Sequence, residues 1–321
     1  MTPQPSTEPE QTRPRFPLEV VHQAARMYYL EEATQAEIAS RLGVSRPTVS
    51  RLLTQARAAG IVRIEVVDPF EDESQALGER LAKALGLNAV RLSPVTHPAT
   101  LGQDLAAPIA AAVRDMQLSA GDAVLISSGQ TTYEVARAGM PPLPGIQLVP
   151  TVGGYADPLP RFQTNEITRL AAQASGAFPA FLFAQALPSA AMLATLREEP
   201  AFQHVTNLWG RARGALLGIG AAPTSRDFLA RGIPATSEAL TSAVGDVCLN
   251  FFDRDGAAIE FDGSDRLVRT SRDVLAAIPH AVGIAVGAQK APSIVGAARG
   301  SLINELVTDV PTARAILDLV A

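Results

Sequence analysis

The sequence predicts an α/β protein in two parts: a small N-terminal helical module, then a larger domain with an open, mostly parallel sheet. Two amphipathic helical segments joined by a tight turn occupy residues 34–60. From Ala89 onward, short apolar strand-like segments alternate with helix-length segments, a pattern typical of strand–helix–strand units. The chain has 321 residues, 47% of them hydrophobic, which is enough for two or three domains with substantial cores.

The first helical segment carries its own start and stop signals. Thr34 and Glu37 have the spacing of a capping box, and Gly43 can adopt the left-handed conformation that ends a helix. Ser45 is a ready N-cap for the second helix, and Pro47 stands in the first turn, where a missing N–H costs nothing. These signals predict a helix-turn-helix.

The two helices are predicted to divide into an inward and an outward face. Inward positions are Ala36, Ile38, Ala39 and Leu42 in the first helix, and Val49, Leu52, Leu53 and Ala56 in the second. We expect the second helix, residues 46–58, to enter a DNA major groove, with Arg46 and Arg51 reaching base edges or phosphates. The candidate DNA-binding residues are Thr34, Gln35, Ser45, Arg46, Thr48, Ser50, Arg51 and Thr54.

Charge supports this interpretation locally. The chain has 27 basic and 32 acidic residues, a net charge of −5, yet five arginines and no acid lie between Arg41 and Ile64. A basic patch on an otherwise acidic protein favours DNA binding at the patch alone. The alternative is an amphipathic helical hairpin with a solvated basic face.

The chain around this motif divides into four expected segments. Five prolines and no apolar period precede Leu18, which predicts a disordered tail. A helix is expected over Leu18–Leu30, a short strand or wing over Ile61–Val67, and a linker helix over Ala76–Leu85. The segments are a tail (1–17), the helix-turn-helix module (18–67), a linker with its helix (68–88) and the effector and oligomerisation domain (89–321).

The larger domain shows eight strand candidates, with helices such as those at 99–116, 132–138 and 165–174 between them. The strands are expected at 90–92, 123–127, 146–149, 180–183, 215–219, 247–251, 281–286 and 302–307. Mostly apolar strands alternating with helices predict a Rossmann-like sheet covered on both faces. The segment Asn250–Glu260, with Asp-Arg-Asp-Gly in its middle, predicts a hairpin.

Open parallel sheets bind ligands beyond the carboxyl ends of their strands. The segment Ser127–Thr132 follows one such strand and opens a helix, so its backbone N–H groups and threonine hydroxyls form a candidate anion cradle. An ordinary helix-capping turn is the alternative. A second candidate is the Gly153–Gly154 pair, which permits close backbone approach or makes a turn.

A third candidate is Lys290, one of only two lysines in the chain. It stands at a strand end shortly before a helix, where the helix dipole disfavours a merely solvated cation. A flexible ammonium group in that position is well placed for an anionic ligand.

Several classes of function are disfavoured. The single cysteine, Cys248, rules out a disulfide framework and lies in an apolar run, which favours a buried thiol. The uncharged stretch Leu170–Leu196 is broken by glycine, prolines and glutamines, so it predicts interior α/β structure and no membrane partner. The N-terminus lacks a secretory signal pattern, and we expect a cytoplasmic protein with no metal site and no cofactor.

With these motifs together, the chain resembles transcriptional regulators of the SorC family, within the DeoR-like sugar-responsive group. The resemblance runs from Leu18 to the C-terminus, through SSGQTTYEVA, LVPTVGGY, LLGIGAAPTSRDF, AVGDVCLNFFDRDG and the segment around GAQKAPSIVGAARG. It implies an effector domain similar to phosphosugar isomerases. The chain departs from the family's pattern at Ser127, Ser128 and residues 157–164.

The resemblance also implies partners and site residues. The partners are double-stranded operator DNA, a sugar or sugar-phosphate effector, and further copies of the chain in a homodimer or homotetramer, through the effector domain and linker helix. Residues that match the family's pattern are Gly129, Thr131, Thr132, Asp253 and Lys290. With residues inferred above, the effector-binding set is Ser128, Gly129, Gln130, Thr131, Thr132, Gly153, Gly154, Asp253 and Lys290.

The expected function is therefore a regulator, repressor or activator, whose operator binding is controlled by a small carbohydrate, with phosphorylated sugars favoured. Two alternatives remain at this stage: a sugar-phosphate isomerase-like enzyme, and a DNA-binding protein that responds to no effector. The four histidines show no metal-ligand or triad spacing, and no acid/base pair stands out, which disfavours the enzyme.

Overall fold

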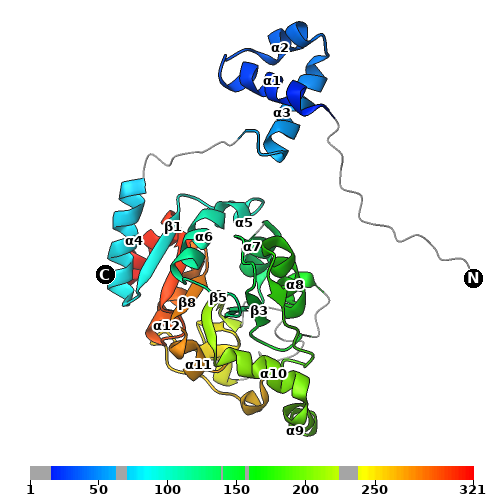
Figure 1. Ribbon diagram of the computed structural model, residues 1–321. Coiled ribbons are helices and arrows are strands. Elements are labelled where there is room, and N and C mark those ends of the chain that lie inside the picture. The colour runs from blue at the N-terminus through cyan, green and yellow to red at the C-terminus, as the bar shows by residue number, and fades with distance from the viewer. Residues whose placement is uncertain (1–15, 63–70, 139, 156–158, 224–237) are drawn as a thin grey trace, which may run out of the picture. The chain divides into compact units, whose positions relative to one another are not determined.

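The computed structural model describes residues 16–62, 71–138, 140–155, 159–223 and 238–321. The chain divides into two compact units, residues 1–68 and 69–321. Figure 1 shows the helices of the first unit and the α/β domain of the second.

The first unit contains α1 (Leu18–Tyr29), α2 (Gln35–Leu42) and α3 (Arg46–Ala58). The capping box of α2 is present, because the Thr34 hydroxyl accepts from the Glu37 N–H and the Glu37 carboxylate accepts from the Thr34 N–H. Gly43 ends α2 with φ +65°, in the left-handed region. The Ser45 hydroxyl caps α3 by accepting from the Thr48 N–H. The predicted helix-turn-helix is confirmed.

The core of this unit forms between α1 and the inward face of α3. Val21 and Ala24 of α1 are fully buried. All four inward residues predicted for α3 are also buried, each with an exposed fraction of 4% or less. In α2 only Ile38 is buried. The inward placement of Ala36 is wrong: at the start of a helix of eight residues, it is exposed.

The unit begins earlier than the predicted boundary at residue 18. The Phe16 N–H donates to the Gln55 side-chain carbonyl, and the Gln55 amide donates to the Phe16 carbonyl, so this residue is fixed to α3. The rest of the expected tail (1–15) and residues 63–67 of the expected wing lie outside the described residues.

The second unit opens with α4 (Glu71–Leu85) and closes with α13 (Val310–Val320). Its strands are β1 (Ala89–Ser93), β2 (Ala123–Ile126), β3 (Gln147–Pro150), β4 (Phe178–Pro179), β5 (Ala212–Ala221), β6 (Gly245–Val247), β7 (Asn250–Phe252), β8 (His280–Ile284) and β9 (Glu305–Asp309). The helices between them are α5 (Leu101–Asp104), α6 (Ala106–Asp115), α7 (Gln130–Ala138), α8 (Thr164–Ser175), α9 (Ala190–Glu198), α10 (Pro200–Trp209), α11 (Arg272–Ala277) and α12 (Ala291–Arg299), with short 3-10 turns including Pro160–Phe162 and Ala288–Lys290.

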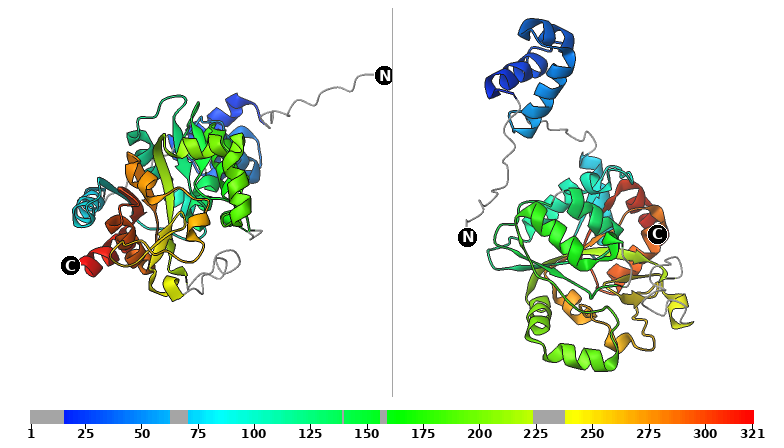
Figure 2. Two further views of the ribbon diagram at one scale, coloured as in Figure 1. Left: turned by 90° about the horizontal axis from the view of Figure 1, so that it is seen from below. Right: turned by 90° about the vertical axis from the view of Figure 1, so that its right-hand side faces the viewer.

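Among the residues that the structure describes, seven strands form a parallel sheet in the order β1-β9-β8-β5-β2-β3-β4. A hairpin of β6 and β7 pairs antiparallel with the last three residues of β5. Helices cover both faces of the sheet, as Figure 2 shows. The predicted open, largely parallel sheet is confirmed.

Neighbouring residues of each central strand enter different cores. In β5, Leu217 belongs to the core shared with α10, α12 and α13, whereas Leu216 belongs to the core shared with α6, α7 and α8. Leu125 and Ile126 of β2 divide in the same way. Burial on both faces explains why these strands are apolar throughout.

Two predicted strands are displaced. The strand expected at 180–183 is wrong in position, since β4 covers Phe178–Pro179 alone, and the one expected at 302–307 begins at Glu305. In the second case Leu302 and Ile303 are buried in the connection before the strand, so their hydrophobicity reports burial and not strand pairing. Burial alone does not fix where pairing begins.

The strand predicted at 247–251 is wrong, because the chain reverses there. Cys248 and Leu249 both have positive φ, +51° and +62°, and form the turn between β6 and β7. Asp246 stabilises the turn by accepting from the Leu249 N–H, and the Asn250 amide donates to the carbonyls of Val247 and Thr270. The hairpin predicted at 250–260 is present and short: Phe252 and Ala258 form an antiparallel bridge, the Asp253 N–H donates to the Ala257 carbonyl and the Ile259 N–H donates to the Phe251 carbonyl.

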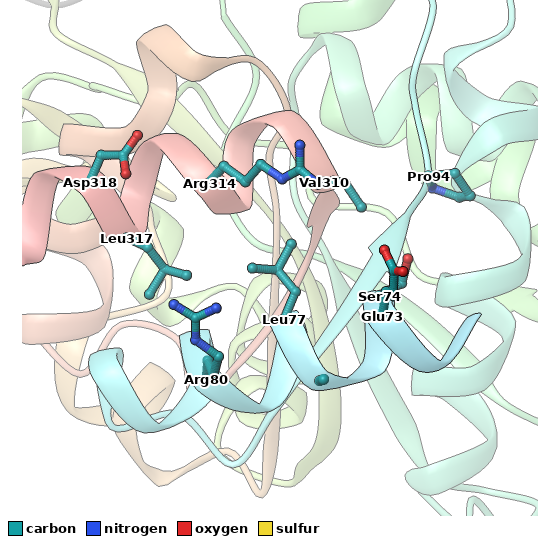
Figure 3. Close-up of a pocket in the computed structure, with 10 residues that line it drawn as sticks. Glu73, Ser74, Leu77, Arg80, Pro94, Val310, Arg314, Leu317 and Asp318 are labelled. Atoms are coloured by element: carbon teal, nitrogen blue, oxygen red, sulfur yellow. The ribbon is translucent and has the colours of Figure 1, made fainter. Parts of the chain in front are cut away.

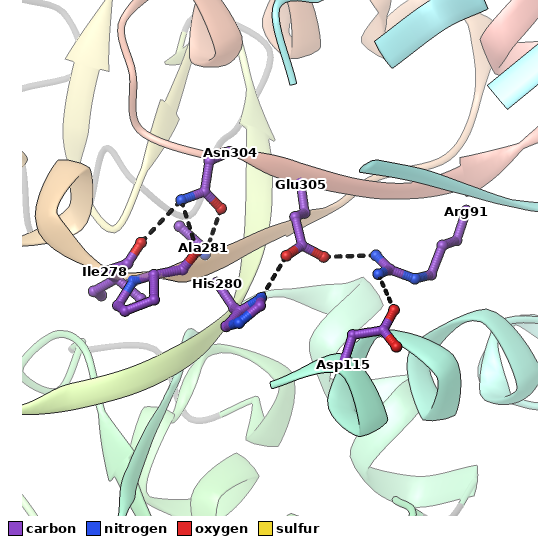
Figure 4. A network of polar contacts seen from close by, with 8 residues as sticks. Arg91, Asp115, Ile278, His280, Ala281, Asn304 and Glu305 are labelled. Atoms are coloured by element: carbon purple, nitrogen blue, oxygen red, sulfur yellow. Dashed lines mark hydrogen bonds and ion pairs between the residues drawn. The ribbon is translucent and has the colours of Figure 1, made fainter. Parts of the chain in front are cut away.

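An ion cluster around the buried Glu305 joins β1, β8, β9 and α6 at the amino-terminal side of the sheet (Figure 4). The Arg91 guanidinium donates to Glu305 at 2.6 Å and to Asp115 at 2.5 Å. The other Glu305 oxygen lies 2.6 Å from Nδ1 of His280. The Glu305 side chain is only 4% exposed, so it depends on these partners to offset its lost hydration.

Replacement of Arg91 by alanine is expected to destabilise the second unit by about 3–5 kcal/mol, because it leaves a buried carboxylate without its main counter-charge. Urea unfolding followed by circular dichroism measures the change. The matched control is Arg114→Ala, an exposed arginine of α6, which is expected to change stability by less than about 0.5 kcal/mol. Equal effects of the two substitutions would contradict this account of the cluster.

Candidate functional sites

The first candidate site is the exposed face of α3. Arg46, Ser50 and Arg51 are exposed along it, while Val49 and Leu52 are buried on the other side. The sequence has five arginines between residues 41 and 64. Of these, Arg41 forms an ion pair with Glu31 at 3.2 Å, and Arg63 lies outside the described residues. Arg46, Arg51 and Arg57 are all exposed, with no ion pair among the described residues.

Several predicted DNA-binding hydroxyls already have partners within the module. The Thr34 hydroxyl donates to Glu37, and these Thr34 hydrogen bonds hold the pKa of the Glu37 carboxyl below its usual value. The Thr54 hydroxyl donates to the Ser50 carbonyl, and the hydroxyls of Ser45 and Thr48 bond each other at 2.8 Å. These hydroxyl groups therefore make hydrogen bonds within the module. The exposed arginines are the side chains that remain available to contact DNA.

A concavity of about 760 Å³ opens where the end of α1 meets the starts of α2 and α3. Tyr28, Gln35 and Arg46 line it together with Glu32, Ala33, Thr34 and Ala36. Tyr28 is 38% exposed. Tyr28 lies in the helix that the sequence predicts over Leu18–Leu30, and helical periodicity alone does not show that its side chain lines a concavity.

The second candidate site lies at the carboxyl edge of the sheet between β2 and β5. From β2 the chain proceeds to β3 and β4 on one side, whereas from β5 it proceeds to β8 and β9 on the other. Such a reversal of strand order opens a crevice at the carboxyl ends of the two strands.

Two loops from distant parts of the chain converge on neighbouring residues of β5 at this edge. The Ser127 hydroxyl accepts from the Gly218 N–H at 2.7 Å. The Lys290 ammonium donates to the carbonyl of Ile219 at 2.8 Å. The loop after β2 and the lysine after β8 are therefore brought together, although 163 positions separate Ser127 from Lys290 in the sequence.

Only part of the predicted anion cradle remains open to a ligand. The Gly129 N–H donates to the Arg161 carbonyl, and the Thr132 hydroxyl donates to the Gly129 carbonyl. Gln130, Thr131 and Thr132 begin α7, and their N–H groups have no hydrogen-bond acceptor among the described residues. These three amides and the Thr131 hydroxyl, which likewise has no described partner, form the remaining donor set.

Gly153 and Gly154 lie in a hydrogen-bonded extension of the sheet and do not form an open loop. The Gly153 N–H donates to the Val268 carbonyl, and the Gly154 N–H donates to the Ala184 carbonyl. A Cβ atom at position 153 would lie 2.6 Å from the Gln185 carbonyl oxygen, so only glycine permits this close approach. The structure therefore explains this pair by backbone packing, with both amides already bonded.

Asp253 is held in its own turn. One carboxylate oxygen accepts from the N–H groups of Asp255 and Ala257. The Asp253 carbonyl lies against Gly296 in α12, six residues after Lys290, or about 9 Å along the helix axis. No described contact joins Asp253 to the residues around Lys290.

A separate groove of about 720 Å³ lies between α4 and α13 (Figure 3). Leu77 and Arg80 point from α4 toward α13, which contributes Arg314, Leu317 and Asp318. Helix α4 packs on β1, three strands away from β5, so this groove is distinct from the crevice at β2 and β5.

The two units have matches in known families. A family model described as a sugar-binding domain matches residues 69–318, and one described as sigma-70 region 4 matches residues 23–59. The deoxyribonucleoside regulator of Bacillus subtilis is 32% identical over 92% of this chain and 96% of its own length. The transcriptional regulator LsrR of an Enterobacter strain is 30% identical over 94% of this chain and 93% of its own.

A solved structure agrees along nearly the whole chain. The full-length sorbitol operon regulator SorC of Klebsiella pneumoniae superimposes with a TM-score of 0.72 at 27% identity, covering 94% of this chain and 99% of that one. The chain belongs to the SorC family of sugar-binding transcriptional regulators. These relatives are regulators and not enzymes, so membership in the SorC family decides against the isomerase alternative.

Across the described residues, no helix is both long enough and apolar enough to span a membrane. The uncharged stretch 170–196 instead contributes parts of α8 and α9 with β4 between them, as the sequence predicted.

Cys248 is buried in its turn, and burial raises the pKa of its thiol to about 12. At pH 8 we expect iodoacetamide to modify this cysteine in the native protein about 1000-fold more slowly than in urea, because the thiolate is the reacting form. Mass spectrometry of timed samples measures both rates. Rapid stoichiometric labelling of the native chain would contradict this expectation.

Proposed function

We propose that the chain is a transcriptional regulator whose affinity for operator DNA is set by a small carbohydrate ligand, phosphorylated in its bound form. The observation that carries the ligand site is the convergence of Ser127 and Lys290 on Gly218 and Ile219 of β5, at the reversal of strand order. Residues 18–67 would bind DNA, and residues 89–321 would bind the ligand.

An anionic group fits this crevice for a physical reason. The first three amides of α7 supply donors at the positive end of its dipole, and the Lys290 ammonium supplies a charge. The Ile219 carbonyl keeps that charge at the edge of the sheet. We propose that the phosphate of the ligand occupies this position, with sugar hydroxyls directed outward from it.

Asp253 would accept sugar hydroxyls, because a carboxylate repels phosphate but pairs well with hydroxyl donors. Its turn against α12 requires the ligand to extend away from Lys290 along that helix. Asp253 would therefore contact only the sugar part of the ligand, and not its phosphate.

For the DNA-binding module, α3 would enter the major groove with Arg46 and Arg51 facing the DNA. The concavity beside it, with Tyr28 and Gln35, would follow the phosphate backbone. The chain would act as a homodimer or homotetramer, so that operators are pseudo-palindromic.

Replacement of Arg51 by alanine is expected to weaken specific operator binding by about 1–3 kcal/mol if this side chain reads a guanine. Fluorescence anisotropy with operator and scrambled DNA at several salt concentrations gives the measurement. A uniform loss on both DNAs with a smaller salt slope would assign Arg51 to a phosphate instead. Unchanged binding to both would remove α3 from the interface.

Replacement of Lys290 by alanine is expected to abolish the response to the ligand and leave operator affinity without ligand nearly unchanged. Thermal-shift titration with a panel of sugars and sugar phosphates measures binding, because a ligand bound only by the native state raises its apparent stability. Lys83→Ala is the matched control, since Lys83 is the other lysine and lies in α4.

Unchanged ligand affinity in the Lys290 variant would refute this site. Preference for an uncharged sugar over its phosphate would refute the phosphorylated ligand. An operator affinity that no member of the panel alters would favour the effector-independent alternative.

A further inference from the structure

The open edge of the sheet beside β4 carries three exposed phenylalanines within six residues. Phe178, Phe181 and Phe183 are 63%, 37% and 80% exposed, and the rings of the last two lie 6.2 Å apart. We infer that this edge, residues 178–183, is where a second copy of the chain docks, by antiparallel pairing of the two edges across a twofold axis.

The backbone of this segment alternates in a way that leaves its outer side unpaired. The N–H groups of Phe178 and Ala180 donate inward to β3 and the residue before it. Farther along, the Ala184 carbonyl accepts from Gly154, and the Ala186 N–H donates back to the Gly154 carbonyl. Phe178, Ala180, Ala184 and Ala186 thus bond to β3 or to its extension, and the Ala186 carbonyl also accepts from the Val268 N–H. Between these residues, the backbone groups of Phe181 and Phe183 face the open edge.

The outward residues are Pro179, Phe181 and Phe183, since the carbonyl of Gln185 packs against Gly153. Proline has no N–H to offer, and the N–H groups of the two phenylalanines donate to no acceptor among the described residues. A row of such groups is a template for another strand.

The segment is firmly held in this extended form. Asn165 of α8 bonds both backbone groups of Leu182, accepting from its N–H at 3.0 Å and donating to its carbonyl at 3.1 Å. Leu182 itself is buried in the core beneath. The exposed phenylalanines therefore lie in β4 and in the fixed, extended segment that follows it, so the ordering entropy of docking is already small.

Charge favours a second copy as the occupant. A twofold axis places each edge against itself, so any net charge on the edge would repel its own image. Residues 170–196 contain no charged side chain, in a chain of which 18% is charged. The usual protection of an edge strand by lysine is also absent from this segment, and Pro179 protects one position alone.

The exposed aromatic area suits a dimer interface. With these exposed fractions, the three phenylalanines present about 350 Å² per copy. Two copies together would bury about 700 Å² from these side chains, close to half of the roughly 1,600 Å² in an interface of standard size. An exposed aromatic patch on one fixed, extended segment marks an interaction site.

This inference rests on the proposed oligomeric assembly and names the surface that builds it. Phe183→Glu tests it, because the side chain is mostly exposed and the substitution brings a carboxylate from each copy into an interface that is otherwise uncharged. We expect the dimer dissociation constant, measured by sedimentation equilibrium on the full chain, to rise about 100-fold or more. Leu319→Glu on α13 is the matched control, with a leucine 51% exposed, and should leave the constant unchanged.

Hydrogen exchange supplies the second readout. In the wild-type dimer the N–H groups of Phe181 and Phe183 should be protected, and in the Phe183→Glu variant a peptide covering 178–186 should exchange faster, with the rest of the sheet unchanged. A wild-type chain that is monomeric at micromolar concentration would refute the assembly itself. A dimer that survives Phe183→Glu, or that only Leu319→Glu disrupts, would refute this surface and leave the assembly standing.

Discussion

Strand β5 pairs with β2 on one side and with β8 on the other, and its last residues also receive the loops that follow those two strands. Its side chains are buried alternately in both cores, which fixes its position in the sheet. Because Ser127 and Lys290 bond adjacent residues of this strand, the candidate ligand site inherits the rigidity of the core. A site built in this way is preorganised for an anion.

The same arrangement gives the ligand a means to act on the whole domain. An anion shared by α7 and Lys290 would contact elements from both halves of the sheet, since α7 connects β2 to β3 and Lys290 follows β8. Ligand contacts that differ between two arrangements of these halves would shift the balance between them. If the copies meet at the edge beside β4, that shift reaches the interface through β3, which pairs with β4 and whose extension at Gly154 bonds residues 184–186.

The DNA-binding module achieves its order by a different route. It is stabilised mostly by local capping and by a small core in which α1 packs against α3. Its polar hydroxyls are bonded internally, and its arginines are left on the surface. This division explains how so small a unit keeps a defined shape while it presents charge to a partner.

The sequence alone determined features that depend on residues three or four apart, such as the capping box of Thr34 and Glu37 and the end of α2 at Gly43. It also predicted the parallel sheet, because strands buried on both faces must be apolar throughout. The tertiary structure decided the rest: the turn at Cys248, the packing of Gly153 and the attachment of Lys290 to Ile219, 71 positions away. These depend on partners that local periodicity does not identify, since each position there is chosen by a contact from a distant part of the chain.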